Sequence, residues 1–286
     1  MAIKALEPEF GLSLMLKVAG MARSSYYYHL QGLNRQSKYD DIVHRLKYLH
    51  KLHKERYGYR RLTAALHNEG IVINHKTVRK LMREHGMECR IRRKRKTGLS
   101  AIGPGLAASP NILNRDFHAD APFEKGVTDV TEFDVGSDRV YVSAILDLYD
   151  GAVISIAYSL KNNTDLIMSM YEQVPDDQKN YLDNMLIHTD QGILYRSVRY
   201  KEFVDSHSIT QSMSRRGNCY DNAVVESFFG TFKAETIRLY RINTLEQLAE
   251  ELKDYARYYN RERLKSTLGY KSPFEYRKDN GFEKFI

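Results

Sequence analysis

Several residue types that mark particular protein classes are scarce or missing from this chain of 286 residues. It has no tryptophan, and its two cysteines, Cys89 and Cys219, are too few for a disulfide framework and lack the CxxC spacing of zinc sites. No apolar run reaches membrane-spanning length, and the start MAIKALEPEF has two glutamates and a proline where a signal peptide needs an apolar stretch. With a mean hydropathy of −0.54, the sequence predicts a soluble, cytoplasmic protein with no membrane partner.

Acidic residues are scarce in the first third of the chain. Residues 1–98 contain 22 Lys and Arg but only 8 Asp and Glu, whereas residues 99–286 contain 22 and 28. A basic arm on a mildly acidic body predicts that the arm binds a polyanion. Nucleic acid fits better than a membrane surface, because the basic helices do not pair a cationic face with a broad apolar one. A basic surface that serves solubility alone is the alternative.

The arm is expected to contain two helical modules. In the first, residues 1–35, the segment LSLMLKVAG ends at Gly20, a common helix stop. Ser24 can then cap a helix through SSYYYHLQG that ends at Gly32. Helix, tight turn and helix are the elements of a helix-turn-helix, although any small helical domain can show them.

The second module, residues 36–97, shows the same pattern more clearly. A first helix has Ile42, Leu46 and Leu49 on one face, a second covers YGYRRLTAALHNEG, and Asn74 can cap a third through HKTVRKLMREHG. The outward residues of that third helix are basic, which suits a recognition helix in a major groove. A solvated amphipathic face is the alternative. The candidate DNA contacts of this module are Arg60, Arg61, Lys76, Arg79, Lys80 and Arg83.

A dense basic run follows, with Arg92, Arg93, Lys94 and Arg95 at its centre. It cannot pack into a core, and it leads into a segment rich in Gly, Ala, Ser and Pro that we interpret as an interdomain linker, residues 98–121. A basic tether along DNA phosphates adds affinity that depends on salt and not on sequence. A merely solvated linker is the alternative.

From about residue 122 the pattern changes to strands. Three β-rich runs separated by short turns predict an antiparallel meander, and a helix, a strand ending at Asp190, another helix, a short strand and a helix carrying Glu226 through about Leu239 follow. This order matches an α/β, RNase H-like catalytic core with a mixed sheet, which we assign to residues 122–240. Residues 241–286 form a helical extension, in which Thr244 and Gln247 predict a capping box. The fold class is thus an α/β core preceded by all-α helix-turn-helix modules.

Three acidic residues carry the functional prediction. Asp129 lies in VTDVT on the first strand, Asp190 follows the fourth strand, and Glu226 lies on a helix, with 35 residues between it and Asp190. Carboxylates alone suit Mg²⁺, or Mn²⁺ in its place, and two such ions clamp the attacking and leaving oxygens of a phosphodiester. We predict that these three residues are catalytic and bind two metal ions, an arrangement that resembles the DDE core of transposases and retroviral integrases.

Five further residues are candidates for contact with DNA. Lys233 follows Glu226 by seven positions, so both lie on one helix face about 10 Å apart along the axis, where Lys233 either holds the phosphate beside the metal site or is a surface lysine. Asn222, one turn before Glu226, either faces the site or caps the helix. His188 points to the same sheet face as Asp190, where it either reaches substrate or is a buried, hydrogen-bonded histidine. Arg215 and Arg216, in a polar loop, either grip DNA or are solvated.

Longer segments resemble one particular family. YGYRRLTAAL, NHKTVRKLM, VTDVTEF, HTDQGILYRS, SMSRRGNCYDNAVVESFFGTFKAE and YYNRERLKSTLGYKSPFEY look like the second-frame product of insertion-sequence transposases of the IS-three family, over nearly the whole chain. Retroviral integrases fit less well, because the C-terminal segment YYNRERLKSTLGYKSPFEY, which lies outside the catalytic triad, matches the IS-three family. The HHCC zinc module of retroviral integrases is also absent from the sequence. Many relatives have a tryptophan before the first catalytic motif, where this chain has Val127.

The resemblance implies a substrate and partners. Family members cleave at the terminal inverted repeats of their element, free a 3′-hydroxyl and insert the element into target DNA. It also implies a nucleoid-associated bacterial protein, an upstream-frame product or fusion partner, and a homodimer or larger assembly on double-stranded DNA. Two other classes remain open: a catalytically silent DNA-binding regulator of transposition, and an RNase H-like nuclease without strand transfer.

Overall fold

The first module consists of three helices. The computed structural model describes residues 2–34, 38–91, 107–215 and 219–285, and begins with α1 (Ala2–Phe10), α2 (Leu12–Val18) and α3 (Arg23–Asn34). The sequence did not predict α1, and α3 begins at Arg23, so Ser24 lies inside the helix and the predicted cap was wrong. The hydroxyl of Tyr26 donates to the Glu7 carboxylate at 3.1 Å and ties α3 to α1.

The three helices predicted for the second module are all present. It contains α4 (Asp40–Leu52), α5 (Tyr59–Asn68) and α6 (His75–Glu84). Leu46, Leu62 and Val78 are fully buried between the three helices. The Asn74 side chain accepts a hydrogen bond from the Lys76 amide at 2.8 Å, which is the predicted cap of α6.

A five-stranded mixed sheet forms the body of the chain. The strands are β1 (Lys125–Val135), β2 (Asp138–Asp147), β3 (Val153–Ser159), β4 (Leu186–Thr189) and β5 (Thr210–Met213), in the order β3-β2-β1-β4-β5. The first three are antiparallel, whereas β4 pairs in parallel with both β1 and β5. This topology confirms the RNase H-like mixed sheet predicted from the element order.

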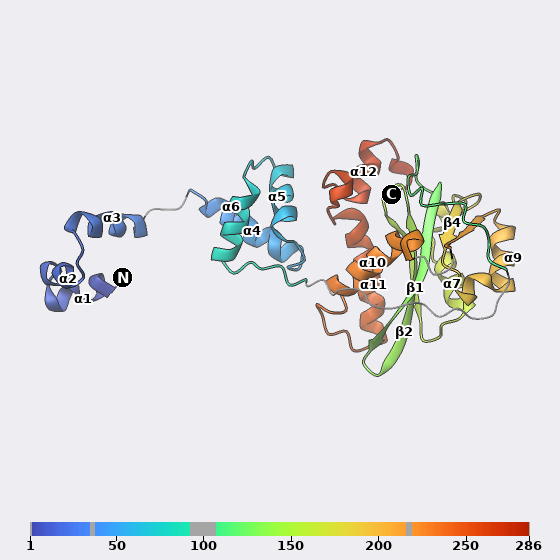
Figure 1. Ribbon diagram of the computed structural model, residues 1–286, viewed down its shortest axis with the longest axis horizontal. Helices are drawn as coiled ribbons and strands as arrows, with labels where there is room; N and C mark the ends of the chain where they lie inside the picture. The colour runs from blue at the N-terminus through green and yellow to red at the C-terminus, as the bar shows by residue number, and fades with distance from the viewer. Residues whose placement is uncertain (1, 35–37, 92–106, 216–218, 286) are drawn as a thin grey trace.

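Helices cover both faces of the sheet, with α7 (Thr164–Glu172) and α9 (Val198–Ser206) on one side and α10 (Ala223–Glu235) and α11 (Leu245–Arg261) on the other (Figure 1). Alternation along each strand decides which side a residue faces. On β2, Ala144 and Leu146 belong to the α10 and α11 core, whereas Ile145 belongs to the core beneath α7 and α9. The face toward α10 is the one that carries the candidate site.

Some boundaries differ from the prediction. The helix of Glu226 ends at Glu235 and not near Leu239, because Thr236 leaves helical backbone geometry at φ −126° and ψ −82°. Two short helices were not predicted, α8 (Asp176–Lys179) and α12 (Pro273–Asp279). Thr244 caps α11 as expected, but the Gln247 side chain accepts from the amide of Asn243 and not of Thr244.

Four 3₁₀ turns complete the described elements: η1 (Ile193–Arg196), η2 (Cys219–Asn222), η3 (Ser266–Leu268) and η4 (Glu283–Phe285). Ser197, directly after η1, caps α9 by accepting from the Tyr200 amide. In the described ranges no helix has the length and apolar character needed to cross a membrane.

Candidate active site

Asp129 and Asp190 lie side by side because of the sheet register. In the parallel pair β1 and β4, Val127 is aligned with His188, and each aspartate lies two residues beyond this pair, Asp129 on β1 and Asp190 directly after the end of β4. Adjacent strands are about 4.8 Å apart. Val127 packs in the core beneath α10, so alternation directs Asp129 to that same face. The sheet therefore presents two neighbouring carboxylates to α10.

Backbone amides hold both carboxylates in place. Oδ1 of Asp129 accepts from the Val130 amide at 2.8 Å, and Oδ1 of Asp190 accepts from the Gly192 amide at 2.8 Å. Gly192 has an ordinary backbone conformation, but a Cβ there would lie 2.7 Å from the Asp190 carboxylate oxygen. A larger residue there would therefore displace the Asp190 carboxylate, whereas the backbone conformation itself does not call for glycine. Sequence reasoning did not single out Gly192, although it stands two residues after Asp190.

The two carboxylates have raised pKa values. Burial raises the pKa of Asp129 to about 8, together with the negative charges of Asp190 and Glu226, against the opposing effects of the Val130 amide and Lys233. Burial also raises the pKa of Asp190, and the Gly192 amide acts in the opposite direction. Carboxylates that are desolvated and close to one another favour the protonated form unless a cation compensates them.

Glu226 and Lys233 lie on α10, which packs against the sheet face of the two aspartates. The charges of both residues influence Asp129, so all four groups belong to one electrostatic cluster. The Lys233 ammonium donates to the carbonyl oxygen of Glu132 on β1 at 2.8 Å. Burial lowers the pKa of Lys233. In the parts of the chain that the structure describes, no three Asp, Glu, His or Cys side chains are gathered closely enough to hold a metal ion.

His188 and Asn222 are buried. The His188 ring has no exposed surface, and its nitrogens lie 2.9 Å from Ser212 Oγ and 3.1 Å from Ser214 Oγ. This arrangement corresponds to the buried, hydrogen-bonded alternative and leaves no surface for DNA; burial lowers the pKa of His188 to about 4. Asn222 stands at the N-cap position of α10 but makes no capping bond from its side chain, and its buried Oδ1 has no hydrogen-bond partner among the described residues.

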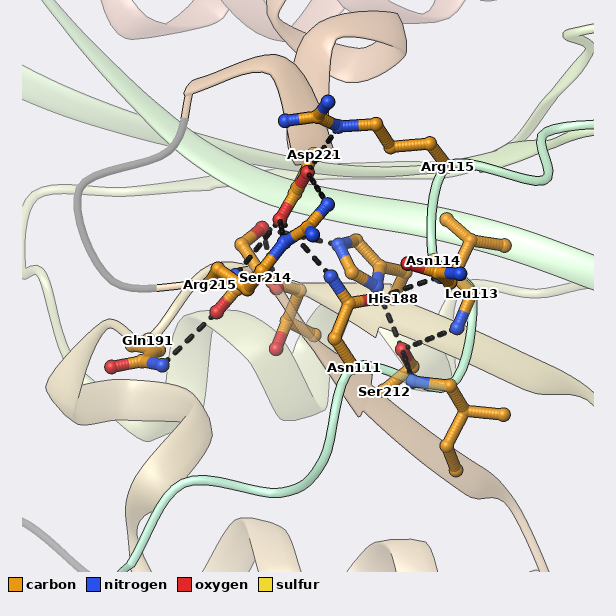
Figure 2. Close-up of polar contacts among 12 residues, drawn as sticks. Asn111, Leu113, Asn114, Arg115, His188, Gln191, Ser212, Ser214, Arg215 and Asp221 are labelled. Carbon is orange, nitrogen blue, oxygen red and sulfur yellow. Dashed lines mark hydrogen bonds and ion pairs between the residues drawn. The ribbon is translucent and has the colours of Figure 1, made fainter.

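Asp221, directly before α10, is the shared hydrogen-bond acceptor of several polar side chains (Figure 2). Asp221 was not among the candidate residues predicted from the sequence. Its buried carboxylate accepts from the amide and guanidinium of Arg215, from Arg115 Nε at 2.7 Å and from Asn111 Nδ2 at 3.0 Å. Hydrogen bonds from Arg215 hold the pKa of Asp221 well below its usual range. The end of the linker and the loop before Glu226 therefore meet on one carboxylate. A paired Asp-Asn before a helix suggests only a cap, so little in the local pattern indicates this role.

The predicted DNA contacts occupy different environments. The four basic side chains of α6 are all exposed, as is Arg60. Arg61 is half-buried, and its Nε donates to the carbonyl oxygen of Leu264 at 3.0 Å. Arg215 is half exposed beside Asp221. The remaining candidates lie outside the described residues: Arg92, Arg93, Lys94, Arg95 and Arg216.

Known families match three stretches of the chain. Residues 38–95 match the HTH-like domain family, which covers the α4–α6 module. Residues 119–219 and 207–273 match two integrase core domain families, which together cover the sheet, α10 and α11. The candidate acidic residues all fall within the integrase core matches.

Curated proteins are similar over almost the whole length. The InsK transposase protein for insertion sequence element IS150 of Escherichia coli (strain K12) is 41% identical over 96% of this chain and 96% of its own. The transposase InsF for insertion sequence IS3A of the same organism is 32% identical over 97% of this chain and 98% of its own. Among solved structures, the catalytic core domain of HTLV-2 integrase in complex with magnesium has 20% identity and a TM-score of 0.44, over 55% of this chain and 98% of that chain.

Proposed function

Because this chain belongs to the insertion-sequence transposases of the IS-three family, we propose that it is a DDE-type transposase, a polynucleotidyl transferase that cleaves and joins DNA strands at the ends of its element. The observation that carries the proposal is that Asp129 on β1 and Asp190 directly after β4 each lie two residues beyond the aligned pair of these parallel strands, on the sheet face covered by the helix of Glu226. We assign the chemistry to these three carboxylates.

The donor set has the chemistry of a divalent-cation site, although among the described residues the three side chains are not gathered closely enough to hold an ion as they stand. Burial raises the pKa of Asp129 and of Asp190, so a nearby cation would stabilise their ionised forms. Carboxylate oxygens are hard donors that suit Mg²⁺ or Mn²⁺. Asp129, Asp190 and Glu226 would hold two ions. When bound, these ions supply activation of a water or a 3′-hydroxyl and stabilisation of the leaving oxygen.

Other residues of the chain serve orientation and binding. The Val130 and Gly192 amides each donate one hydrogen bond that orients an aspartate. Lys233, on the Glu226 face of α10, would orient a phosphate beside the site. The exposed cations of α6, with Arg60 and Arg215, would contact the phosphates of double-stranded DNA. Pairing two element ends calls for a homodimer or larger assembly, with an upstream-frame product as a further partner.

Strand transfer tests this proposal. The wild-type chain is incubated with Mg²⁺ or Mn²⁺ and labelled oligonucleotides taken from the DNA that flanks the gene, beside Glu226→Gln and Asp190→Asn. Joined products from the wild type alone are expected. Each variant should retain DNA affinity, because neither side chain belongs to the basic surface that we assign to binding.

Two outcomes would replace the proposal. Metal-dependent cleavage without joining would identify a nuclease of the same fold. Binding without cleavage by all three proteins, with or without the upstream-frame product, would identify a DNA-binding regulator. Asp183→Asn is a suitable control for the loss of one acidic charge, since Asp183 is exposed in the loop before β4.

A further inference from the structure

One strained turn carries two of the side chains by which the α4–α6 module contacts the body of the chain. Directly after α4, Lys54 and Glu55 both adopt positive φ angles, 52° and 59°, which are uncommon for residues other than glycine. The turn directs the next two side chains, Arg56 and Tyr57, toward α11 and the end of α10, which lie beside the module (Figure 1). Strain of this kind persists where surrounding contacts over-determine the backbone.

Arg56 makes its side-chain contacts across the boundary between module and body. Its side chain is only 2% exposed, Nε donates to the carbonyl oxygen of Glu235 at 3.0 Å, and a terminal nitrogen pairs with Glu251 at 3.0 Å. Its guanidinium also lies over three rings of the body, those of Tyr240, Tyr255 and Tyr258. A buried guanidinium satisfied in this way fixes orientation more strictly than an apolar contact does, because its donors require defined partners.

Tyr57 adds a second fixed point. Its ring is fully buried and stacks on His53 with the ring centroids 3.9 Å apart. Its hydroxyl donates to the carbonyl oxygen of Glu262 at 3.0 Å and accepts from the amide of Leu264 at 2.9 Å. A single hydroxyl therefore bonds two backbone groups of the segment that follows α11, one as donor and one as acceptor.

Glu235 connects this boundary to the candidate active site. It is the last residue of α10, nine residues after Glu226 on the same helix, which is about 13 Å along the axis. Its buried carboxylate pairs with Arg263 at 2.8 Å and accepts from the Tyr255 hydroxyl at 3.0 Å, while its carbonyl receives Arg56. The helix that carries Glu226 is thus anchored at its far end by the helix-turn-helix module.

We propose that Arg56, at the end of the catalytic helix, and Tyr57, at the segment after α11, dock the helix-turn-helix module onto the body as a rigid unit, so that the distance from the DNA bound by α6 to the cleaved phosphodiester is set within one chain. Arg56 acts as a positioning residue. The idea rests on the proposed transposase function, since it concerns which phosphodiester is cut. A module joined by a flexible tether alone would not need buried polar partners on both sides of the boundary.

The test uses the full chain and the variants Arg56→Ala, Arg56→Lys and Tyr57→Phe. Lys51→Ala is the matched control, because Lys51 is an exposed cation on α4 of the same module. The groups that accept hydrogen bonds from the Arg56 side chain belong to the body, so its loss should leave the fold of the module intact. Circular dichroism and the affinity for an end oligonucleotide check this, and affinity is expected to stay within about twofold, since the variants leave the cations of α6 in place.

Hydrogen exchange measures docking without any need for activity. In Arg56→Ala and Tyr57→Phe, the amide of Leu264 and the amides of α11 should exchange at least about tenfold faster than in the wild type or Lys51→Ala, because local opening becomes easier. Arg56→Lys should behave like Arg56→Ala, because an ammonium cannot reach both partners with the geometry of a guanidinium. Unchanged exchange in all variants would overturn the docking.

Cleavage mapping on an end-labelled oligonucleotide then measures positioning. Wild type and Lys51→Ala are expected to cut at one phosphodiester, whereas Arg56→Ala cuts at several neighbouring ones or at least about tenfold more slowly, because the reacting groups are less well aligned. Faster exchange with an unchanged cleavage position and rate would overturn the positioning role. If the wild type does not cleave at all, the proposed function fails, and hydrogen exchange still decides whether the module is docked.

Discussion

Asp129 on β1 and Asp190, directly after the end of the adjacent parallel strand β4, each lie two residues beyond the aligned pair Val127 and His188. The arrangement places two like charges together in a desolvated setting, which opposes folding at neutral pH. Active sites commonly carry such a cost, because the groups are arranged for chemistry and not for stability. The first prediction follows from this conflict.

Asp129→Asn should stabilise the fold at neutral pH. The folded pKa of about 8 lies above the unfolded value of about 3.9, so between these pH values only the folded chain retains the proton. Stability of the wild type therefore falls as pH rises from about 4 to about 8, whereas the amide does not titrate. At pH 7 the gain should be at least about 1 kcal/mol, since one pKa unit corresponds to about 1.4 kcal/mol.

Thermal unfolding from about pH 4 to about pH 8 measures the effect, with Asp183→Asn as the surface control. The advantage of Asp129→Asn should vanish near the unfolded pKa, because below it both states of the wild type are protonated. Mg²⁺ should raise the melting temperature of the wild type and not of the variant, because a ligand stabilises only the fold that binds it. A variant less stable than the wild type at neutral pH would show that the carboxylate is structurally required.

Gly192→Ala should disable the site without unfolding the chain. The added methyl would lie 2.7 Å from Asp190 Oδ1, so this carboxylate must move, while the backbone at φ −58° accepts alanine. A shift of about 1 Å in a reacting group can cost about a hundredfold in rate. The expected result is a loss of strand transfer of about ten- to a hundredfold, with a stability change below about 1 kcal/mol.

Gly230→Ala is the matched control. Gly230 lies on the exposed side of α10, and a Cβ there would meet nothing within 4 Å. The substitution should retain strand transfer and stabilise the helix by up to about 1 kcal/mol. Equal activity of the two alanine variants would mean that the placement of Asp190 by the Gly192 region does not matter for the reaction.

Much of this architecture could be predicted from local patterns. Period-two alternation, Gly136 in the first hairpin and the caps at Asn74 and Ser197 specify their elements through neighbouring residues, so the strands and most helices were predicted correctly. The placement of Asp129 and Asp190 also follows from strand order, once the parallel pairing of β1 and β4 is assumed.

Contacts between distant segments could not be predicted in this way. The sequence gives Arg61 the appearance of a DNA-binding cation, because nothing near it shows that the carbonyl of Leu264, 203 residues later, is its partner. The contact between Arg56 and Glu235 and the contacts of Asn111 and Arg115 with Asp221 likewise join residues far apart in the sequence, so no local pattern predicts them. A charged residue in a basic segment is ambiguous until its partner is known, since surface and buried pairs have the same local pattern.

The exposed cations of α6 should control the salt dependence of DNA binding. Removing one phosphate contact is expected to reduce the slope of log K against log salt by about 0.9. Arg79→Ala should therefore lower both affinity and slope, whereas Lys201→Ala, on the distant α9, should change neither. Fluorescence anisotropy from about 50 to about 300 mM salt measures both quantities. An unchanged slope in Arg79→Ala would remove this residue from the DNA interface.

Asp221→Asn should lower both stability and activity. The buried carboxylate accepts from Asn111, Arg115 and Arg215, and a neutral amide cannot retain the two charged pairs. Because both arginines are about half exposed, water compensates part of the loss, and we expect a cost of about 1–3 kcal/mol. Asp205→Asn is the control, since Asp205 pairs with Lys201 at the surface and should cost less than about 1 kcal/mol.

The pH dependence of stability distinguishes the loss of the charged Asp221 pairs from a general loss of packing. The pKa of Asp221 is depressed in the fold, so its contribution is present above the unfolded value of about 3.9 and is lost as pH falls toward the folded value. The stability gap between wild type and Asp221→Asn should therefore narrow below about pH 4. Strand transfer should fall at least about tenfold while DNA affinity changes less, because Asp221 precedes α10 and sets where the helix of Glu226 begins. A gap that is constant from about pH 3 to neutral pH, or full strand transfer, would mean that the carboxylate only fills space between the linker and the loop.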